Sequence, residues 1–415
     1  MTDATAMERP AAEERFGVAR LLEMADAGGF TYDPPVIDGA SDAEIDQGAR
    51  KVVNFASCSF LGMHVDGEVI SEFNDAARVH GLATGGSRMV QGKIQPHADL
   101  ESALAKVTGH ESAMTFASGL LANIGFVTAM TQSSKIARDL LQLEMPRTVF
   151  VLDRDSHWSI RKAVEALPYK DQVFYFAHND PNSLREVLAE LDGQLAVVMF
   201  ESVYSADGSV APVGDIVDAA EEFGALTFID DANGFLVYGG ADRPFHDEFD
   251  AIKRCTFHMV SFSKAVGLEG GGLAASEEFI RAFEYLSGTS AFTATMLPPA
   301  AAASTFVMDK LENDRGIVNR YLDRAAQFRQ SLIDLGCTLN PTPTYITSVH
   351  IGRDDVAEAA RQEFLQRGYL VPVFRYPAVK VGQAGLRLML NANHSDAHIE
   401  QFLDVMADVR NRFGF

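Results

Sequence analysis

Runs of apolar residues alternate with helical patterns between about residues 95 and 263. Residues 96–109 have helical spacing and end at glycine, a common helix stop. Two more helical patterns, SLREVLAELDG and GDIVDAAEEFG, separate runs that are apolar at almost every position. Strands buried on both faces have this composition, and a strand–helix–strand rhythm builds a parallel sheet. The expected strands are AMTFAS, TVFVLD, VFYFAH, LAVVMFES, LTFIDD and TFHMVSFS.

The rhythm changes after Pro298 and Pro299, where a long helical stretch covers residues 300–335. It is followed by ITSVHIG, the helix DDVAEAARQEFLQRG, the runs YLVPVF and GLRLMLN, and a last helix DAHIEQFLDVMADVRNRF. This order predicts a small α+β domain. The first 50 residues are polar apart from one amphipathic stretch at 17–27. We therefore expect an N-terminal arm (1–55), a large α/β domain (56–300) and a small C-terminal α+β domain (301–415).

The length and the charge narrow the class of protein. A chain of 415 residues exceeds what one hydrophobic core usually holds, which agrees with two domains. The net charge of −22 argues against a general binder of nucleic acid or of anionic membranes. The three cysteines lie far apart without metal-ligand spacing, so we expect reduced thiols, no metal and a cytoplasmic location. The acidic, polar start is unlike a secretory signal, and no apolar run is long enough to span a bilayer.

Polar residues end several of the expected strands, and ligands of open α/β sheets bind beyond such ends. Lys264 follows the last of these strands among small hydroxyl residues, and Asp230 ends the strand before it. To pyridoxal phosphate (PLP), a protein contributes an amine for a Schiff base, a carboxylate that keeps the pyridine nitrogen charged, and hydroxyls that grip the phosphate. The sequence therefore predicts a PLP site at this edge of the sheet. The strand-end residues are Ser118, Asp153, Glu201, Asp230 and Ser263.

The ordered motifs resemble the α-oxoamine synthase family of PLP enzymes from residue 54 to the last helix. They are NFASCSFLGM, GLATGGSRMVQGKIQPHADLE, TFASGLLANIGF, LDRDSHWSI, FAHNDPNSL, ESVYSADGSVAPVGDI, IDDANGF, SFSKAVGLEGGG, FTATMLPP and GLRLMLNANHS. GGSRMVQG and TATMLPP look most similar to the serine palmitoyltransferase branch. The resemblance implies PLP fold type I, the aspartate-aminotransferase-like fold with a mostly parallel sheet. It also implies decarboxylative condensation of an amino acid with an acyl thioester, from CoA or a carrier protein, to an aminoketone.

The resemblance assigns the catalytic roles to three residues. Lys264 would carry the Schiff base and then act as acid and base at Cα. Asp230 would pair with the pyridine nitrogen, although the adjacent Asp231 is an alternative that faces the opposite way on a strand. His157 would stack on the cofactor ring, and it can also polarise the thioester carbonyl or steer the substrate carboxylate. The neighbouring Trp158 is as readily a packed core aromatic as a ligand contact.

Further residues are implied around the cofactor. Backbone N–H groups at a helix start bind phosphate well, and residues 118–120 lie where a strand passes into a helix. The resemblance places Thr295 at the phosphate of the neighbouring subunit, which implies a homodimer with shared sites. Arg387 would bind the amino-acid carboxylate, with Arg375 as a second candidate. The remaining cofactor contacts implied are Ser118, Gly119, Leu120, Ser261 and Ser263 at the phosphate, Ser205 near the 3′-oxygen, and Glu201, which supports the site.

Two positions depart from the family pattern on the amino-acid side of the site. Asn233 stands where most relatives have a histidine that hydrogen-bonds the cofactor 3′-oxygen, and Cys58 stands where relatives have asparagine. Leu120 also replaces a common aromatic residue. We therefore expect a non-standard substrate pair in specialised or lipid metabolism. A PLP lyase, racemase or aminotransferase on the same fold, or a non-catalytic partner subunit, are the alternatives, and the presence of Lys264 argues against the last.

Overall fold

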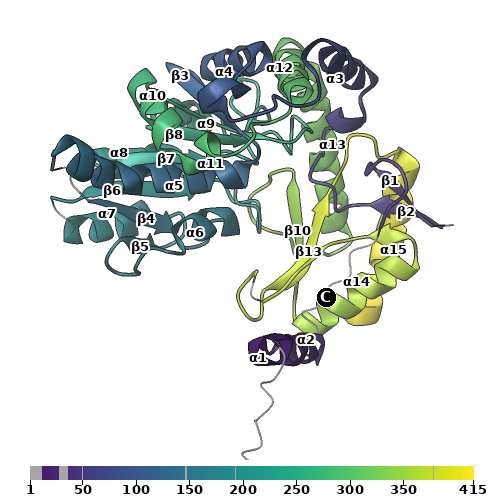
Figure 1. The fold of residues 1–415 in the computed structure, drawn as a ribbon. Helices are drawn as coiled ribbons and strands as arrows, with labels where there is room; N and C mark the ends of the chain where they lie inside the picture. The colour runs from purple at the N-terminus through teal and green to yellow at the C-terminus, as the bar shows by residue number, and fades with distance from the viewer. Residues whose placement is uncertain (1–11, 28–35, 49, 145–146, 192, 377) are drawn as a thin grey trace, which may run out of the picture.

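The computed structural model describes residues 12–27, 36–48, 50–144, 147–191, 193–376 and 378–415. A seven-stranded sheet in the order β3-β9-β8-β7-β6-β4-β5 forms the centre of the larger part (Figure 1). Its strands are β3 (Ser112–Phe116), β4 (Thr148–Asp153), β5 (Val173–Phe176), β6 (Leu195–Glu201), β7 (Leu226–Asp230), β8 (Phe257–Ser261) and β9 (Gly271–Ala275). The six strands expected from the apolar runs are confirmed, and the sheet is mostly parallel. The expected PLP fold type I is confirmed as well, by the relatives described below.

Strand β9 is the one member of this sheet that the pattern of apolar runs did not predict. It pairs antiparallel with both β3 and β8. Its sequence GGLAA contains two glycines, which weaken the strand signal because they offer no side chain to pack. The structure requires both: a Cβ on Gly271 would lie 2.7 Å from the Gly119 nitrogen, and one on Gly272 would lie 2.3 Å from Leu104.

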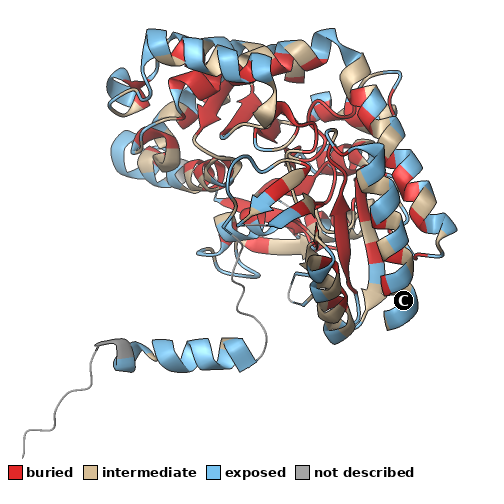
Figure 2. Cartoon of the chain, turned by 90° about the vertical axis from the view of Figure 1, so that its right-hand side faces the viewer, coloured by how far each residue is buried: buried red, intermediate tan, exposed pale blue. Residues whose placement is uncertain are grey.

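Alternate residues of each central strand enter two different hydrophobic cores. Val149 and Val151 of β4 pack with one cluster, whereas Phe150 and Leu152 pack with the other. The first cluster lies under the helices at residues 95–108, 181–190, 213–222 and 298–313. The second lies under the helices at residues 119–136, 158–164 and 277–286. Burial on both faces explains why the strands are continuously apolar, and Figure 2 shows the strands buried beneath exposed helices.

The spacing predicted three helices of this part, at residues 95–108, 181–190 and 213–222. The helical stretch expected at 300–335 is divided at Asp314 into two helices, because Asp314 ends the first and caps the second. The helices of this part lie on both faces of the sheet. They are α3 (Gly67–His80), α4 (Gln95–Thr108), α5 (Gly119–Ile136), α6 (Trp158–Val164), α7 (Pro181–Glu190), α8 (Val213–Glu222), α9 (His246–Ala251), α10 (Glu277–Leu286), α11 (Gly288–Ala291) and α12 (Pro298–Asn313). Short 3₁₀ or π segments cover Met63–Val65, Arg88–Gly92, Ala137–Leu141 and Ile252–Arg254.

Two small three-stranded sheets lie beside the large one. One contains β10 (Ile346–Gly352), β13 (Ala384–Met389) and β12 (Val373–Phe374), and the other β1 (Glu44–Gln47), β2 (Arg50–Asn54) and β11 (Tyr369–Leu370). The run YLVPVF thus supplies strands to both sheets, interrupted at Val371 and Pro372. Their helices are α13 (Arg315–Asp334), α14 (Asp354–Gln366) and α15 (Asp396–Phe413).

The N-terminal segment is joined to the C-terminal part of the chain. Strand β2 pairs in parallel with β11, and Phe55 stacks on Phe328, His394 and Phe402. The domain boundaries near 55 and 300 stay a prediction. Helices α1 (Ala12–Phe16) and α2 (Val18–Ala27) project from the body (Figure 2), and α2 buries none of its residues. In the part of the chain that is described, no helix is long and apolar enough to cross a membrane.

Candidate active site

The carboxyl ends of β6, β7 and β8 bring the predicted polar residues to one edge of the sheet. Glu201 is in register with Asp230, and Asp230 with Met259, two residues before Ser261. Lys264 follows in the turn after β8. Parallel neighbours end at the same edge, so residues that are 60 positions apart in the sequence converge there.

Asp230 and Asp231 make different contacts. Asp230 accepts hydrogen bonds from Asn123 Nδ2 at 3.1 Å and from the Ala232 N–H at 3.1 Å. Asp231 accepts instead from Ser202 Oγ and from His258 Nε2. The two adjacent side chains thus have separate partners, as alternation along a strand requires. Of the two, Asp230 is the one whose charge acts on both Lys264 and His157.

Lys264 is half-buried, and burial lowers the pKa of its amine. Cys58, Asp230 and Glu201 oppose this shift, while Arg387 adds to it. These interactions place residues from four separate chain segments around one amine. A lowered pKa increases the fraction of free amine near neutral pH, the form that attacks an aldehyde.

Glu201 is buried, and its carboxylate accepts a hydrogen bond from the His157 N–H. Burial, reinforced by the charge of Asp230, raises the pKa of Glu201 well above its ordinary value. Such a shift favours a neutral carboxyl group between the other acidic residues. Glu201 therefore holds the His157 backbone, and its raised pKa limits the negative charge that it contributes beside Lys264.

His157 caps the start of α6, where its Nδ1 accepts from the Ser159 N–H at 3.2 Å. Ser159 Oγ lies 2.7 Å from the same Nδ1 and itself accepts from Asn123 Nδ2 at 3.0 Å. Desolvation lowers the pKa of His157. The charge of Asp230 opposes this shift, whereas the charges of Lys264 and Arg387 add to it. The ring is therefore held in one orientation as a neutral imidazole. Its neighbour Trp158 is 61% exposed, which is not the environment of a core aromatic.

Asn123 is a site residue that the motifs did not single out. It is fully buried and connects Asp230 with Ser159, and through Ser159 with His157. Its position on α5, four residues after Gly119, places both on the same helix face. The four-residue spacing from Gly119 could have indicated that Asn123 faces the site. An asparagine in an apolar helix is recognised as a site residue only once its partners are known.

The start of α5 and the lysine turn approach closely enough to bind a phosphate. Ser118 caps α5 by accepting from the Leu121 N–H at 3.2 Å, and a Cβ on Gly119 would lie 3.2 Å from Ser261 Cβ. Ser261 Oγ and Ser263 Oγ lie 2.8 Å apart. The N-terminus of the 18-residue helix α5 and the two hydroxyls are a suitable set of hydrogen-bond donors for an anion. Leu120, also at this start, is partly exposed.

Thr295 lies on the segment before α12, and its buried Oγ1 has no hydrogen-bond partner in the described part of the chain. The next residue, Met296, packs against Gly270 and accepts from His97 Nε2 at 2.8 Å. No described contact joins Thr295 to Ser118, Ser261 or Ser263. Its placement at the phosphate stays a prediction.

Arg387 is a buried cation in the middle of β13. It is 9% exposed, its guanidinium lies over the Phe374 ring at 5.3 Å, and its Nε has no partner. Among the described residues it forms no ion pair. A buried guanidinium without a counter-ion fits a carboxylate-bearing ligand. Arg375 acts on Glu358 of α14, and no described interaction brings it to Lys264 or Arg387.

The two unusual residues occupy different surroundings. Asn233 is buried; its Nδ2 donates to the Val203 carbonyl at 3.0 Å, its Oδ1 has no described partner, and its backbone carbonyl accepts from Tyr345 Oη at 2.8 Å. Cys58 is half-buried and acts on Lys264. Ser205 is half-buried in the turn after β6.

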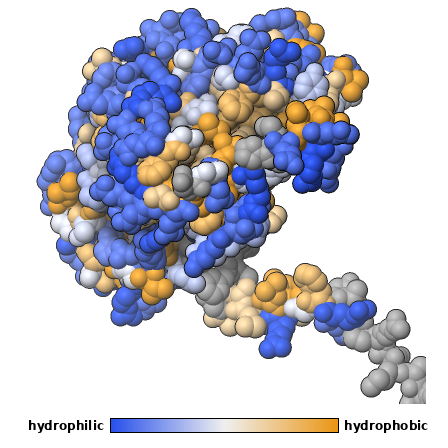
Figure 3. All heavy atoms as spheres, turned by 90° about the vertical axis from the view of Figure 1, so that its left-hand side faces the viewer, coloured by the Kyte–Doolittle hydropathy of each residue, from blue (hydrophilic) through white to orange (hydrophobic). Residues whose placement is uncertain are grey.

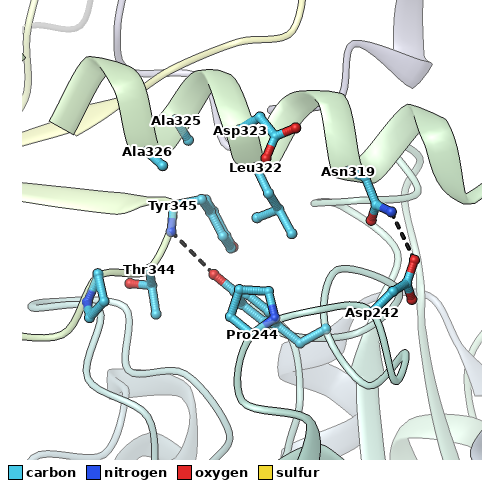
Figure 4. Close-up of a pocket in the computed structure, with 11 residues that line it drawn as sticks. Asp242, Pro244, Asn319, Leu322, Asp323, Ala325, Ala326, Thr344 and Tyr345 are labelled. Atoms are coloured by element: carbon cyan, nitrogen blue, oxygen red, sulfur yellow. Dashed lines mark hydrogen bonds between the residues drawn. The ribbon is translucent and has the colours of Figure 1, made fainter. Parts of the chain in front are cut away.

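A separate cavity of about 360 Å³ lies between α13 and the loops that contain residues 238–244 and 343–345 (Figure 4). None of its lining residues is a predicted site residue. Tyr345 lines this cavity, and it contacts the site through Asn233. The lining residues are Tyr238, Asp242, Pro244, Asn319, Leu322, Asp323, Ala325, Ala326, Pro343, Thr344 and Tyr345.

The residues at the sheet edge fit PLP. An amine of lowered pKa, a buried carboxylate, a helix start with two hydroxyls and an unpaired arginine form a donor set for an anionic, aldehyde-bearing aromatic ligand. Fold and site together define a PLP-dependent enzyme of fold type I. Among the described residues, no group of three or more His, Cys, Asp or Glu side chains is arranged for a metal ion.

Comparison with known proteins gives the family. The family described as aminotransferase class I and II matches residues 50–406, and the chain belongs to it. The 8-amino-7-oxononanoate synthase of Alkaliphilus metalliredigens is 31% identical over 380 residues, 90% of this chain and 92% of its own. The 5-aminolevulinate synthase 2 of Cereibacter sphaeroides is 28% identical over 370 residues, 88% of each chain.

Solved structures agree with this assignment. A serine palmitoyltransferase of Sphingomonas wittichii has a TM-score of 0.84 and 27% identity, covering 98% of this chain and 99% of its own. A serine palmitoyltransferase from S. paucimobilis with bound PLP and myriocin has a TM-score of 0.85 and 25% identity, covering 98% and 100%. These relatives are α-oxoamine synthases, so the resemblance expected from the motifs is confirmed, as are PLP and the C-acyltransferase class.

The lowered pKa of Lys264 predicts its reactivity in the cofactor-free protein. An amine-acylating reagent applied at a series of pH values should modify Lys264 at a lower pH than it modifies the exposed Lys106, with peptides counted by mass spectrometry. Asp230→Asn should move the Lys264 profile further down, because the Asp230 charge opposes the shift. A Lys264 profile that coincides with that of Lys106 in both proteins would contradict the proposed environment.

Proposed function

We propose that this chain condenses an amino acid with an acyl thioester, with loss of CO₂ and of the thiol, and forms an aminoketone. The observation that carries the proposal is the buried, unpaired Arg387 within electrostatic reach of Lys264 and His157. Arg387 binds the substrate carboxylate by a bidentate fork. Lys264 then lies at the amino-acid carbon that loses its proton.

Bound PLP supplies an aldehyde for the amino group and an electron-withdrawing ring that stabilises negative charge at Cα. Asp230, held by Asn123, keeps a positive charge at the ring nitrogen. Lys264 holds the Cα proton and later returns it. His157, fixed by Ser159 and by the Glu201 contact to its N–H, would face the cofactor ring and would donate from Nε2 to the thioester carbonyl. Ser118, Gly119, Leu120, Ser261 and Ser263 hold the phosphate, with Ser205 near the 3′-oxygen.

The substrate pair is inferred to differ from glycine, alanine or serine with a primary-metabolism acyl-CoA. Cys58 is a poor hydrogen-bond partner compared with asparagine, and it acts directly on Lys264. Asn233 cannot carry a proton as histidine does, and its amide N–H already donates to Val203. Both differences lie on the amino-acid side, where Arg375 is a further carboxylate-binding candidate. The expected setting is specialised or lipid metabolism in the cytoplasm.

The reaction is tested with a panel of amino acids against acyl-CoA and acyl carrier protein thioesters, followed by free-thiol release, CO₂ release and product mass. One pair should give thiol and CO₂ in equal amounts, and Lys264→Ala should abolish both. Keto-acid formation without thiol release would instead favour an aminotransferase, the second function that the exchange at Asn233 supports. Efficient turnover of serine, glycine or alanine with a common acyl-CoA would contradict the expected substrate difference.

Arg387→Lys should separate binding from chemistry. Lysine keeps the charge but loses the fork, so KM for the amino acid should rise about tenfold to a hundredfold while KM for the thioester stays within about twofold. Steady-state kinetics measure this difference, and Arg329→Lys, at a buried arginine that is hydrogen-bonded to Asn340, serves as the matched comparison. An equal rise in both KM values would mean that Arg387 acts on the fold rather than on the amino acid.

We also propose a homodimer with shared active sites. Exposed apolar residues, Met89 and Val90 on one segment and Phe292 and Leu297 on another, flank Thr295. The two segments are joined by the Ser87–Ala294 bridge and the Ser87 Oγ bond to the Ala291 carbonyl. Single exposed apolar residues are common, but a group on two connected segments indicates an interface.

The dimer predicts a particle of twice the 45.1 kDa chain mass in analytical ultracentrifugation. Val90→Glu combined with Phe292→Glu should give monomers that bind PLP more weakly, since Thr295 of the second copy would be lost. The same pair of substitutions at Val79 and Tyr285, which are also exposed, is the control. A wild-type monomer that binds PLP and turns over would exclude the shared site.

A further inference from the structure

Three buried side chains on neighbouring strands, or just after them, form a hydrogen-bonded group next to the residues assigned to the cofactor. Asp231 is 2% exposed, and its two oxygens accept from Ser202 Oγ and from His258 Nε2, the latter at 3.0 Å. Ser202 follows β6 and is fully buried, and His258 lies within β8 and is 4% exposed. The function proposed above uses none of these three residues.

The unpaired ring nitrogen of His258 indicates which nitrogen donates to Asp231. His258 Nδ1 is buried without a partner in the described part of the chain. An unpaired N–H costs more there than an unpaired lone pair, so a hydrogen sits on Nε2, which donates to Asp231. Around the ring, burial lowers the pKa of His110, whose ring centroid lies 5.8 Å away, and raises the pKa of Cys255 to about 12. Burial thus disfavours a charge on His110 and on Cys255.

The contact joins the strands that supply the site. Ser202 is the residue after Glu201, Asp231 the residue after Asp230, and His258 lies three residues before Ser261. The backbone repeats the connection, because the Ser202 N–H donates to the Asp230 carbonyl at 3.1 Å and the Asp231 N–H to the Met259 carbonyl at 2.8 Å. The side-chain contacts of Asp231 and these backbone bonds thus tie the same short stretch of chain, residues 230 and 231, to both neighbouring strands.

The turn after Asp231 is packed closely against its carboxylate. A Cβ on Gly234 would lie 2.5 Å from Asp231 Oδ1 and 2.3 Å from the Phe249 ring. A side chain at position 234 would therefore press on the Asp231 carboxylate. That carboxylate is buried, as is the carboxylate of the adjacent Asp230.

We propose that Ser202, Asp231 and His258 form a positioning unit that fixes Asp230 relative to Lys264 and adds a second buried negative charge behind it. The unit rests on the proposed role of Asp230 at the ring nitrogen. It acts on the cofactor through Asp230, so its members are positioning residues rather than catalytic ones. Breaking the unit should change how the protein holds PLP before any acyl donor is present.

The test compares His258→Leu with His258→Gln, because glutamine can place an N–H donor near the position of Nε2. The readouts are the Kd of PLP for the cofactor-free protein and the pH midpoint of the absorbance band of the loaded protein. His258→Leu should weaken PLP binding about tenfold and move the midpoint by about one pH unit. His258→Gln should restore both values to within about twofold and about 0.3 pH units of the wild type.

A second buried histidine distinguishes positioning from a loss of stability. His394 accepts from the Asn391 N–H at 2.9 Å and is 2% exposed, but it lies away from the sheet edge. His394→Leu should lower the melting temperature without moving the absorbance midpoint. If His258→Leu does the same, with unchanged Kd and midpoint, the unit is structural only and the proposal is wrong.

Ser202→Ala removes the other contact of Asp231 with little change in volume, so it decides the question if His258→Leu does not fold. It should move the Kd and the midpoint in the same direction as expected for His258→Leu, and unchanged values would overturn the proposal. Both readouts are taken without an acyl thioester. A protein that shows the shifts but releases no thiol would therefore contradict the proposed function and leave the positioning unit supported.

Discussion

Burial of several carboxylates at one edge of a parallel sheet is the constraint on which the site depends. Glu201, Asp230 and Asp231 end or follow neighbouring strands and are each less than 5% exposed. Like charges at this separation in a low dielectric repel strongly unless each is neutralised or hydrogen-bonded. The structure resolves the conflict differently at each residue. Burial raises the pKa of Glu201, each oxygen of Asp231 accepts a hydrogen bond, and Asp230 accepts from Asn123 and from the Ala232 N–H.

The Asp230 carboxylate acts on two groups across the site, the Lys264 amine and the His157 ring. Lys264 and Arg387 come from different sheets, and each acts on the pKa of His157. These two cations also repel each other. The region between them therefore suits a ligand that has negative phosphate and carboxylate groups as well as a positive ring nitrogen. The arrangement is unfavourable for the protein alone and favourable for the protein with such a ligand, which is the usual relation between stability and function at a site.

The sequence predicted the parts of the fold whose signal is local. Six strands were identified because a strand buried on both faces is apolar throughout, and the lysine turn because its residue types are chemically unusual together. The pattern missed β9, where glycines are needed for close packing against α5, and it did not separate β11 from β12 around Val371 and Pro372. In both cases tertiary contacts set the structure and local propensity did not.

Residues that act through partners were the hardest to find from the sequence. Asn123 resembles an ordinary polar residue in a helix, and Asp231 was visible only as an alternative to Asp230. Their roles depend on Ser159, Ser202 and His258, which are distant in sequence and close in space.

The orientation of Asn233 likewise depends on its hydrogen-bond partners. Reversing its amide would place its oxygen against the Val203 carbonyl, so the observed orientation, with Nδ2 toward Val203, is the one that hydrogen bonding allows. Tyr345 holds the Asn233 backbone from the other side and packs on Phe60 at 4.3 Å, two residues from Cys58. The two departures from the family pattern are therefore connected through two aromatic residues, Tyr345 and Phe60, that pack on each other.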